Sequence, residues 1–204
     1  FMERFFDLAS ASSVGCPAGF VGQITANSFM KREFGAKLIE SYIPRWDVTH
    51  IVDTSRAHIP EHGTPTVILF GRNQEPRGDS VRVVMGIRAE HKTPTDAANG
   101  LVWTAISKQI DHPGSESEFV SVGDIDRATF YKHPWSIGGG GVSELKSDIE
   151  ARCTRVLEDV IDQIGFVAVT REDEAYLVGT PVARRKFIPS NQVLPLVSGD
   201  CIRD

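Results

Sequence analysis

Two histidines lie in a short loop directly before the most apolar run of the sequence. His58 and His62 flank Ile59 and Pro60, and the run Thr66–Phe70 follows closely. An apolar run that begins with β-branched residues predicts a strand buried on both faces. Ligands of open α/β sheets bind outside the strand ends, so side chains of this loop can press on a bound substrate. Spacing alone favours the simpler interpretation, in which both imidazoles are solvated.

Asp53 is a second candidate, because it ends a predicted strand and a carboxylate at a strand tip can be catalytic. Capping of a turn with Ser55 explains the same residue, and this interpretation is favoured. The sequence contains no GxGxxG, GxxxxGK[ST], HExxH or GxSxG motif. We therefore expect no catalytic residue of a recognisable type within this chain.

Two tryptophans and a basic run are candidates for contacts with nucleic acid. Trp103 lies within an apolar helix face and is predicted to be core, whereas Trp135 is predicted to be open and able to stack on bases. Arg184, Arg185 and Lys186 can contact DNA phosphates, and a solvated basic turn explains them equally well.

Net charge and cysteine spacing restrict which of these functional interpretations are plausible for the chain alone. The chain has 204 residues and a net charge of −5, which counts against tight DNA binding by this chain alone. Its cysteines (Cys16, Cys153 and Cys201) are odd in number and widely spaced, so neither a disulfide framework nor a zinc site is expected. A reducing cytoplasm is the expected compartment, with no membrane association. The start at Phe1 and the ending CIRD suggest a fragment of a longer protein.

Hydrophobic periodicity predicts the elements that must position these residues. A helix separates the first two strands, as in a parallel crossover unit, and closely spaced strands follow, as at an antiparallel edge of a mostly parallel sheet. The sequence thus predicts an α/β fold with a mixed sheet. The expected helices cover residues 1–9, 28–43 and 93–110, and the expected strands cover residues 19–27, 47–55, 64–72, 80–90 and 119–125.

A run of four glycines, Gly138–Gly141, interrupts this pattern. It lacks the preceding strand and following lysine of a phosphate-binding loop, so we interpret residues 138–143 as a flexible linker. A first domain would then cover residues 1–137 and a second segment residues 144–204. Residues 143–164 predict a helix with an apolar stripe. Short strands are expected at 165–169, 174–180, 186–190 and 192–197.

The order of these elements resembles the later half of an adenine-specific DNA methyltransferase of the type that carries an NPPY motif. The segments that carry the resemblance are GFVGQITANSFMKREFGAKLIESYI (19–43), THIVDTSRAHIPEHGTPTVILF (49–70) and WSIGGGG (135–141). HGTPTVILFGRN (62–73) is similar in particular to the large methyltransferases of the Pgl/BREX phage-defence systems. The resemblance covers residues 1–144 well and the remainder weakly.

The resemblance implies the later part of a Rossmann-like methyltransferase sheet, followed by the start of an α+β target-recognition segment. It implies methyl transfer from S-adenosylmethionine to the exocyclic amino group of adenine in double-stranded DNA, in a phage-defence or restriction–modification system. The NPPY motif and the cofactor loop are absent from this sequence, so the chain alone is expected to be inactive. In the family, the loop before the last strand pair helps to hold the extruded base. His58, Ile59, Pro60 and His62 occupy that loop here.

Two other functions stay open. The chain can be a non-catalytic module of a defence complex that binds DNA or a protein, or part of a nuclease-linked restriction enzyme of the same family. An NPPY motif shortly upstream would support the methyltransferase. A sheet cut through its middle would expose an edge strand, so poor solubility or a dimer is expected for the isolated chain.

Overall fold

The computed structural model describes residues 2–162 and 171–196. The chain divides into two compact units, residues 1–153 and residues 154–204. Each unit is described by itself. No helix among the described residues has the length and apolar character needed to cross a membrane.

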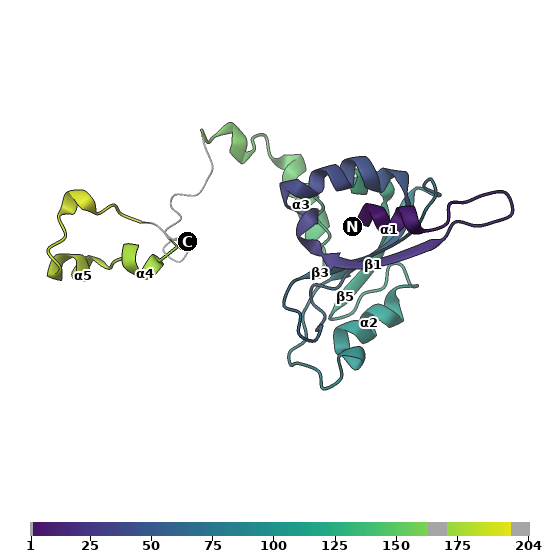
Figure 1. The fold of residues 1–204 in the computed structure, drawn as a ribbon, viewed down its shortest axis with the longest axis horizontal. Coiled ribbons are helices and arrows are strands. Elements are labelled where there is room, and N and C mark those ends of the chain that lie inside the picture. Colours follow the sequence, from purple (N-terminus) through teal and green to yellow (C-terminus); the bar gives the residue numbers. More distant parts are fainter. Residues whose placement is uncertain (1, 163–170, 197–204) are drawn as a thin grey trace. The chain divides into compact units, whose positions relative to one another are not determined.

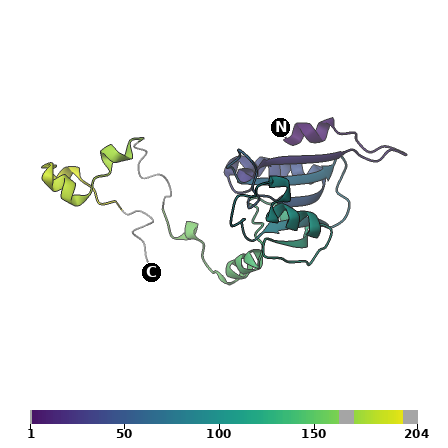
Figure 2. The same cartoon turned by 90° about the horizontal axis from the view of Figure 1, so that it is seen from below.

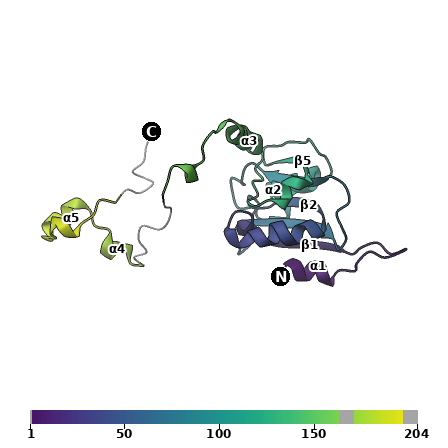
Figure 3. The ribbon, with the colours of Figure 1, turned by 90° about the horizontal axis from the view of Figure 1, so that it is seen from above.

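The first unit is built around a mixed sheet. Its order is β1-β3-β2-β4-β5, so that β2 lies at the centre, between β1 and β5 in Figure 3. The β2–β4 pairing is parallel, and the other pairings are antiparallel. The strands are β1 (Phe20–Ala26), β2 (Asp47–Asp53), β3 (Thr66–Arg72), β4 (Ser80–Gly86) and β5 (Val120–Asp126).

The α/β class and the mixed sheet are as predicted, but the expectation of a mostly parallel sheet is wrong. β1 and β2 point the same way, as a crossover requires, yet β3 lies between them and is antiparallel to both. The connection from β2 to β3, residues 54–65, contains no helix. A loop without a helix can turn the chain back beside the strand that it leaves, whereas a parallel pairing of consecutive strands usually needs a crossover built on a helix.

Short helical turns cover one face of the sheet together with α1 (Met2–Leu8), as Figure 1 shows. The continuous helix predicted over 28–43 is wrong. A Cβ atom at Gly35 would collide with the carbonyl oxygen of Phe29, so the backbone folds back on itself there. Pro44 limits the segment further. The turns are η1 (Asn27–Met30), η2 (Glu33–Gly35), the π-helical η3 (Leu38–Tyr42) and η4 (Ile43–Arg45).

Apolar side chains fill both faces of the sheet. On the α1 side, the rings of Phe6 and Trp46 stack with centroids 4.1 Å apart, within a large buried cluster. On the other side, α2 (Leu101–Gln109) buries Val102 and Ile106 against the sheet. This helix is shorter than predicted, because a separate turn, η5 (Ala97–Asn99), precedes it.

Within the glycine run, Gly139 is packed against the sheet, so the interpretation of the whole run as a flexible linker is wrong at this residue. Gly139 is buried, and a Cβ atom there would lie 2.9 Å from the carbonyl oxygen of Met85 and 2.7 Å from a side-chain carbon of Ile87. Gly140 and Gly141 have φ values of 66° and 79°, which favour glycine. The compact unit extends through α3 (Val142–Arg152) rather than ending at these glycines.

The helix predicted over 143–164 is also wrong in its length. α3 ends at Arg152, and Cys153 is extended, with φ −74° and ψ 126°. Most helical stability in proteins comes from burial of an apolar face. Here the predicted stripe is exposed at Ile149, Val156 and Val160. Without such burial, continuing the helix beyond Arg152 would add little stabilising free energy.

Helical turns also replace the strands predicted for the second unit. Isolated strands need pairing partners, and the described residues of this unit offer none. Pro181 instead lies in the first turn of α5, where its fixed φ suits a helix. The strand predicted at 165–169 and the end of that predicted at 192–197 lie outside the described residues. The observed elements are η7 (Leu157–Asp159), α4 (Asp173–Tyr176), α5 (Thr180–Arg185) and η8 (Ser190–Gln192).

Candidate functional site

The carboxyl ends of three strands meet at one edge of the sheet. β1 and β2 are both antiparallel to β3, and β4 is parallel to β2, so Ala26, Asp53 and Gly86 end their strands at the same edge. Ligands of α/β sheets bind outside this edge. The segment between β2 and β3, residues 54–65, projects from it. We call this segment the 54–65 loop.

Hydrogen bonds close the base of the 54–65 loop. The Thr54 amide donates to the Thr66 carbonyl at 3.1 Å, and the two threonine hydroxyls lie 2.7 Å apart. An Asp53 carboxylate oxygen accepts from the Ser55 amide at 2.9 Å. The favoured interpretation of Asp53 as a turn cap is therefore confirmed.

A tight turn forms the tip of the loop. The His62 amide donates to the Ile59 carbonyl at 3.2 Å, which closes the turn around Pro60 and Glu61. Glu61 has φ 59°, in the left-handed region. Proline at the second position and positive φ at the third are the arrangement of a type II turn. The tip of the loop therefore has a defined backbone conformation.

Helix α2 holds the middle of the loop from outside. The indole nitrogen of Trp103 donates to the His58 carbonyl at 3.2 Å. The Trp103 ring is partly buried and packs against the apolar cluster on the α2 face of the sheet. Its prediction as a core residue is confirmed in part, since the ring also borders solvent beside the loop.

The four residues predicted for a target-base pocket share one loop but not one depression. His58 and Ile59 border two shallow depressions, of about 140 and 350 Å³. The smaller depression also contains His62 and is lined mainly by polar residues of the 54–65 loop. The larger one contains Pro60 and lies against α2, where Trp103 contributes to an apolar lining. His58 is half-buried, whereas Pro60 and His62 are exposed.

Trp135 does not have the position predicted for it. Its side chain is 2% exposed, its ring packs edge-on against Phe29 and Phe130, and its indole nitrogen donates to the Phe130 carbonyl at 3.2 Å. The expectation of an open ring is wrong, because this aromatic cluster leaves no face for a base. Arg184, Arg185 and Lys186 are exposed at the end of α5. Their contact with phosphates stays a prediction.

The carboxyl edge also carries an exposed ionic cluster that spacing did not indicate. Arg88 donates to a Glu118 carboxylate oxygen at 2.6 Å, and His91 lies 3.3 Å from the same oxygen. The hydrogen bond from Arg88, followed in size of effect by that from His91, lowers the pKa of Glu118 below its ordinary value. Nearby, Glu90 accepts from the Val102 amide at 3.2 Å, at the start of α2. This carboxylate fixes the helix that holds the loop.

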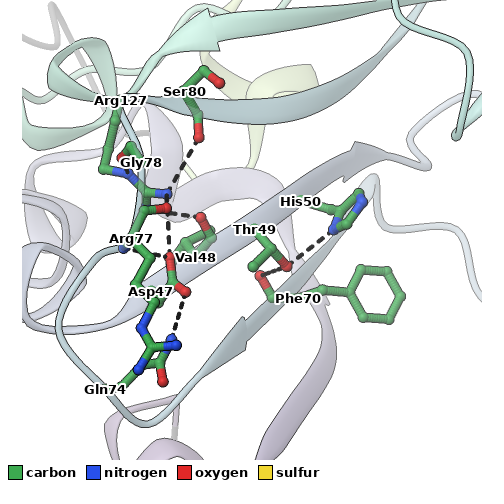
Figure 4. Close-up of polar contacts among 10 residues, drawn as sticks. All are labelled: Asp47, Val48, Thr49, His50, Phe70, Gln74, Arg77, Gly78, Ser80 and Arg127. Carbon is green, nitrogen blue, oxygen red and sulfur yellow. Dashed lines mark hydrogen bonds and ion pairs between the residues drawn. The ribbon is translucent and has the colours of Figure 1, made fainter. Parts of the chain in front are cut away.

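A buried ion pair at the opposite edge is structural (Figure 4). Arg127 donates to Asp47 at 3.2 Å, and to the carbonyls of Val48 and Gly78 at 2.9 Å each. The second Asp47 oxygen accepts from Gln74 at 2.9 Å. Sequence reasoning missed this pair, since the two residues lie 80 positions apart and no local pattern joins them.

These features define an α/β protein whose mixed sheet is compatible with part of a Rossmann-like methyltransferase fold. The chain is 45% identical over 209 aligned residues to the adenine-specific methyltransferase PglX of Streptomyces coelicolor. The alignment covers all of this chain and 17% of PglX. The resemblance found in the sequence is confirmed, and the chain is related to one segment of that methyltransferase. None of the protein-family models matches the chain.

The described residues do not fit S-adenosylmethionine. In the described part of the chain, no glycine-rich turn leads from a strand into a helix at the carboxyl edge, and β1 is followed directly by Asn27 and Ser28. The depressions beside the 54–65 loop are shallow. We therefore assign no cofactor-binding residue within this chain.

Proposed function

We propose that this chain is part of a site-specific DNA adenine methyltransferase. The enzyme transfers a methyl group from S-adenosylmethionine to the exocyclic amino group of adenine in double-stranded DNA, in a phage-defence or restriction–modification system. The observation that carries the proposal is the 45% identity to PglX along the whole chain. Because the chain spans 17% of that relative, catalysis is attributed to the longer protein and not to these residues alone.

The 54–65 loop forms a wall of the target-base pocket in this proposal. Two features support it: the loop projects from the carboxyl edge of the sheet, and its base, middle and tip are each fixed by hydrogen bonds. A base must leave the duplex before its amino group can react. A wall that is already ordered loses less conformational entropy when it receives the base. Ile59 and Pro60 offer apolar surface, and His58 and His62 offer imidazole groups.

Contacts with the DNA backbone are proposed for the second unit. Arg184, Arg185 and Lys186 form an exposed basic run at the end of α5. Cations of this kind position a protein on phosphates without reading the sequence. We also propose other proteins of the same defence system as partners of the longer protein, and the cytoplasm as its location.

The proposal for the loop is tested by replacing both histidines with alanine in the full-length enzyme. We expect H58A/H62A to lower kcat/KM for DNA methylation by about tenfold or more, because each pocket contact acts on the same bound base. Transfer of labelled methyl groups to unmethylated DNA measures this directly. H112A is the matched control, since His112 is an exposed histidine outside the loop.

The outcomes separate the enzyme from a binding module. Normal methylation by H58A/H62A would show that the loop is not a wall of the target-base pocket. Specific DNA binding without methyl transfer by the unmodified full-length protein would instead favour a non-catalytic module.

A further inference from the structure

The middle of the 54–65 loop depends on a side chain from another element. The base of the loop is held by Thr54 and Thr66, and its tip by the bond from His62 to Ile59. Between them, the His58 carbonyl accepts from the indole nitrogen of Trp103 at 3.2 Å. Trp103 lies 45 positions later in the chain, on α2. The bond therefore links the loop to a helix that packs on the sheet.

Helix α2 is a firm support for this bond. Val102 is fully buried and Ile106 is 5% exposed, both within the cluster on that face of the sheet. Glu90 accepts from the Val102 amide at the start of the helix. The indole itself packs against the same apolar cluster. The indole N–H is therefore fixed in position by the helix. The hydrogen bond forms only when the loop places the His58 carbonyl next to it.

We propose that Trp103 is a positioning residue, which sets the backbone at His58 and so places the wall of the target-base pocket. This inference rests on the proposed function. Without the indole N–H, the His58 carbonyl loses its partner on α2 and the loop samples other conformations. If fewer molecules hold the binding-competent conformation, apparent affinity for the substrate falls in proportion. The effect should appear in KM for DNA, with little change in kcat.

Two matched variants of α2 separate positioning from simple destabilisation. W103F keeps an apolar ring and removes the donor. I106V removes one methylene from the buried face of the same helix and leaves the donor in place. Both are made in the full-length protein. Hydrogen exchange is followed at the amides of Ala57 and His62, which donate within the loop to Thr54 and Ile59, respectively. The Thr54 amide, at the base of the loop, is the internal reference.

We expect W103F to accelerate exchange at Ala57 and His62 by about five- to tenfold and to raise KM for DNA by a similar factor, the range of one net hydrogen bond. I106V should leave both quantities close to those of the unmodified protein. Unchanged exchange or unchanged KM in W103F would overturn the inference, as would an equal effect of I106V. Absence of methylation in the unmodified protein would overturn the proposed function instead, and with it the role assigned to the loop.

Discussion

At the scale of single residues, the Asp47–Arg127 pair should dominate the stability of the first unit. Both side chains are almost completely buried, and Arg127 also donates to several backbone carbonyls. Removal of one partner of a buried pair leaves an uncompensated charge. We expect R127M to lower the free energy of unfolding by about 3–5 kcal/mol, measured by urea denaturation.

The exposed pair between Lys146 and Glu150 provides the comparison, with a separation of 3.0 Å on α3. K146M should change the free energy of unfolding by less than about 0.5 kcal/mol. Similar losses in R127M and K146M would show that burial does not determine the contribution of the Arg127 pair.

His50 should make stability depend on pH. Burial lowers the pKa of His50 below its ordinary value of 6.5, and the positive charge of Arg82 lowers it further. The folded state therefore binds fewer protons at this site than the unfolded chain. Its contribution to stability is complete above about pH 6.5 and is lost as the pH falls through the lowered pKa. H50Q should show a smaller loss of unfolding free energy than the unmodified chain between about pH 8 and pH 5.

The comparison of the two proteins isolates His50, because the remaining histidines are common to both. Equal pH dependence would contradict the assigned shift. The pKa of Asp124 is lowered by its hydrogen bond with Arg82, so its contribution is lost only below its ordinary value of 3.8 and does not overlap this window.

The sequence predicted some residue roles and missed others for physical reasons. Asp53 was predicted to cap a local turn, and a bond between residues two positions apart can be read from sequence. Trp135 was predicted to be open, because the glycines that follow suggested a loop. Its burial depends on Phe29, about a hundred positions earlier in the chain. Arg127 depends on Asp47 in the same way.

At the scale of elements, the packing of the glycine run can be tested directly. An alanine Cβ at Gly139 would lie within 3 Å of Met85, Ile87 and Ser121, including a backbone oxygen. We expect G139A to lower the free energy of unfolding by about 1–3 kcal/mol, the usual range for overpacking. G63A is the control, because a Cβ atom at Gly63 meets nothing within 4 Å. A flexible linker would instead tolerate G139A as well as G63A.

The predicted strands were close to those observed, but their pairing was not. Strand identity follows from local apolar runs such as Thr66–Phe70, which lie within β3. Pairing depends on where each strand meets the others, and β3 enters between β1 and β2. The predicted length of the helix that begins near residue 143 was wrong because burial of its apolar stripe was assumed. Among the described residues this stripe is exposed beyond Arg152, and α3 ends at Arg152.

At the scale of the whole molecule, the free edge of β1 should drive association of the isolated chain. β1 is an edge strand beside α1, as Figure 2 shows. Phe20 and Ile24 are 62% and 54% exposed, and an open groove of about 560 Å³ runs between the strand and α1. Exposed edges with apolar side chains pair with other chains. We expect I24K to shift the 204-residue chain toward monomer in sedimentation velocity.

Ile149 gives the matched control, since it is 53% exposed on α3 and the same substitution can be made there. Association reduced by I149K but not by I24K would place the self-association on α3 and contradict the edge prediction. A chain that stays monomeric at all concentrations would contradict self-association through either surface.

We have proposed that this chain forms part of a methyltransferase that acts on adenine in DNA. The most direct test is to incubate the full-length protein with S-adenosylmethionine and unmethylated double-stranded DNA, and to identify the modified nucleosides by mass spectrometry. We expect N6-methyldeoxyadenosine, formed only when S-adenosylmethionine is present. Methylcytosine, or DNA that is bound but left unmodified, would contradict it.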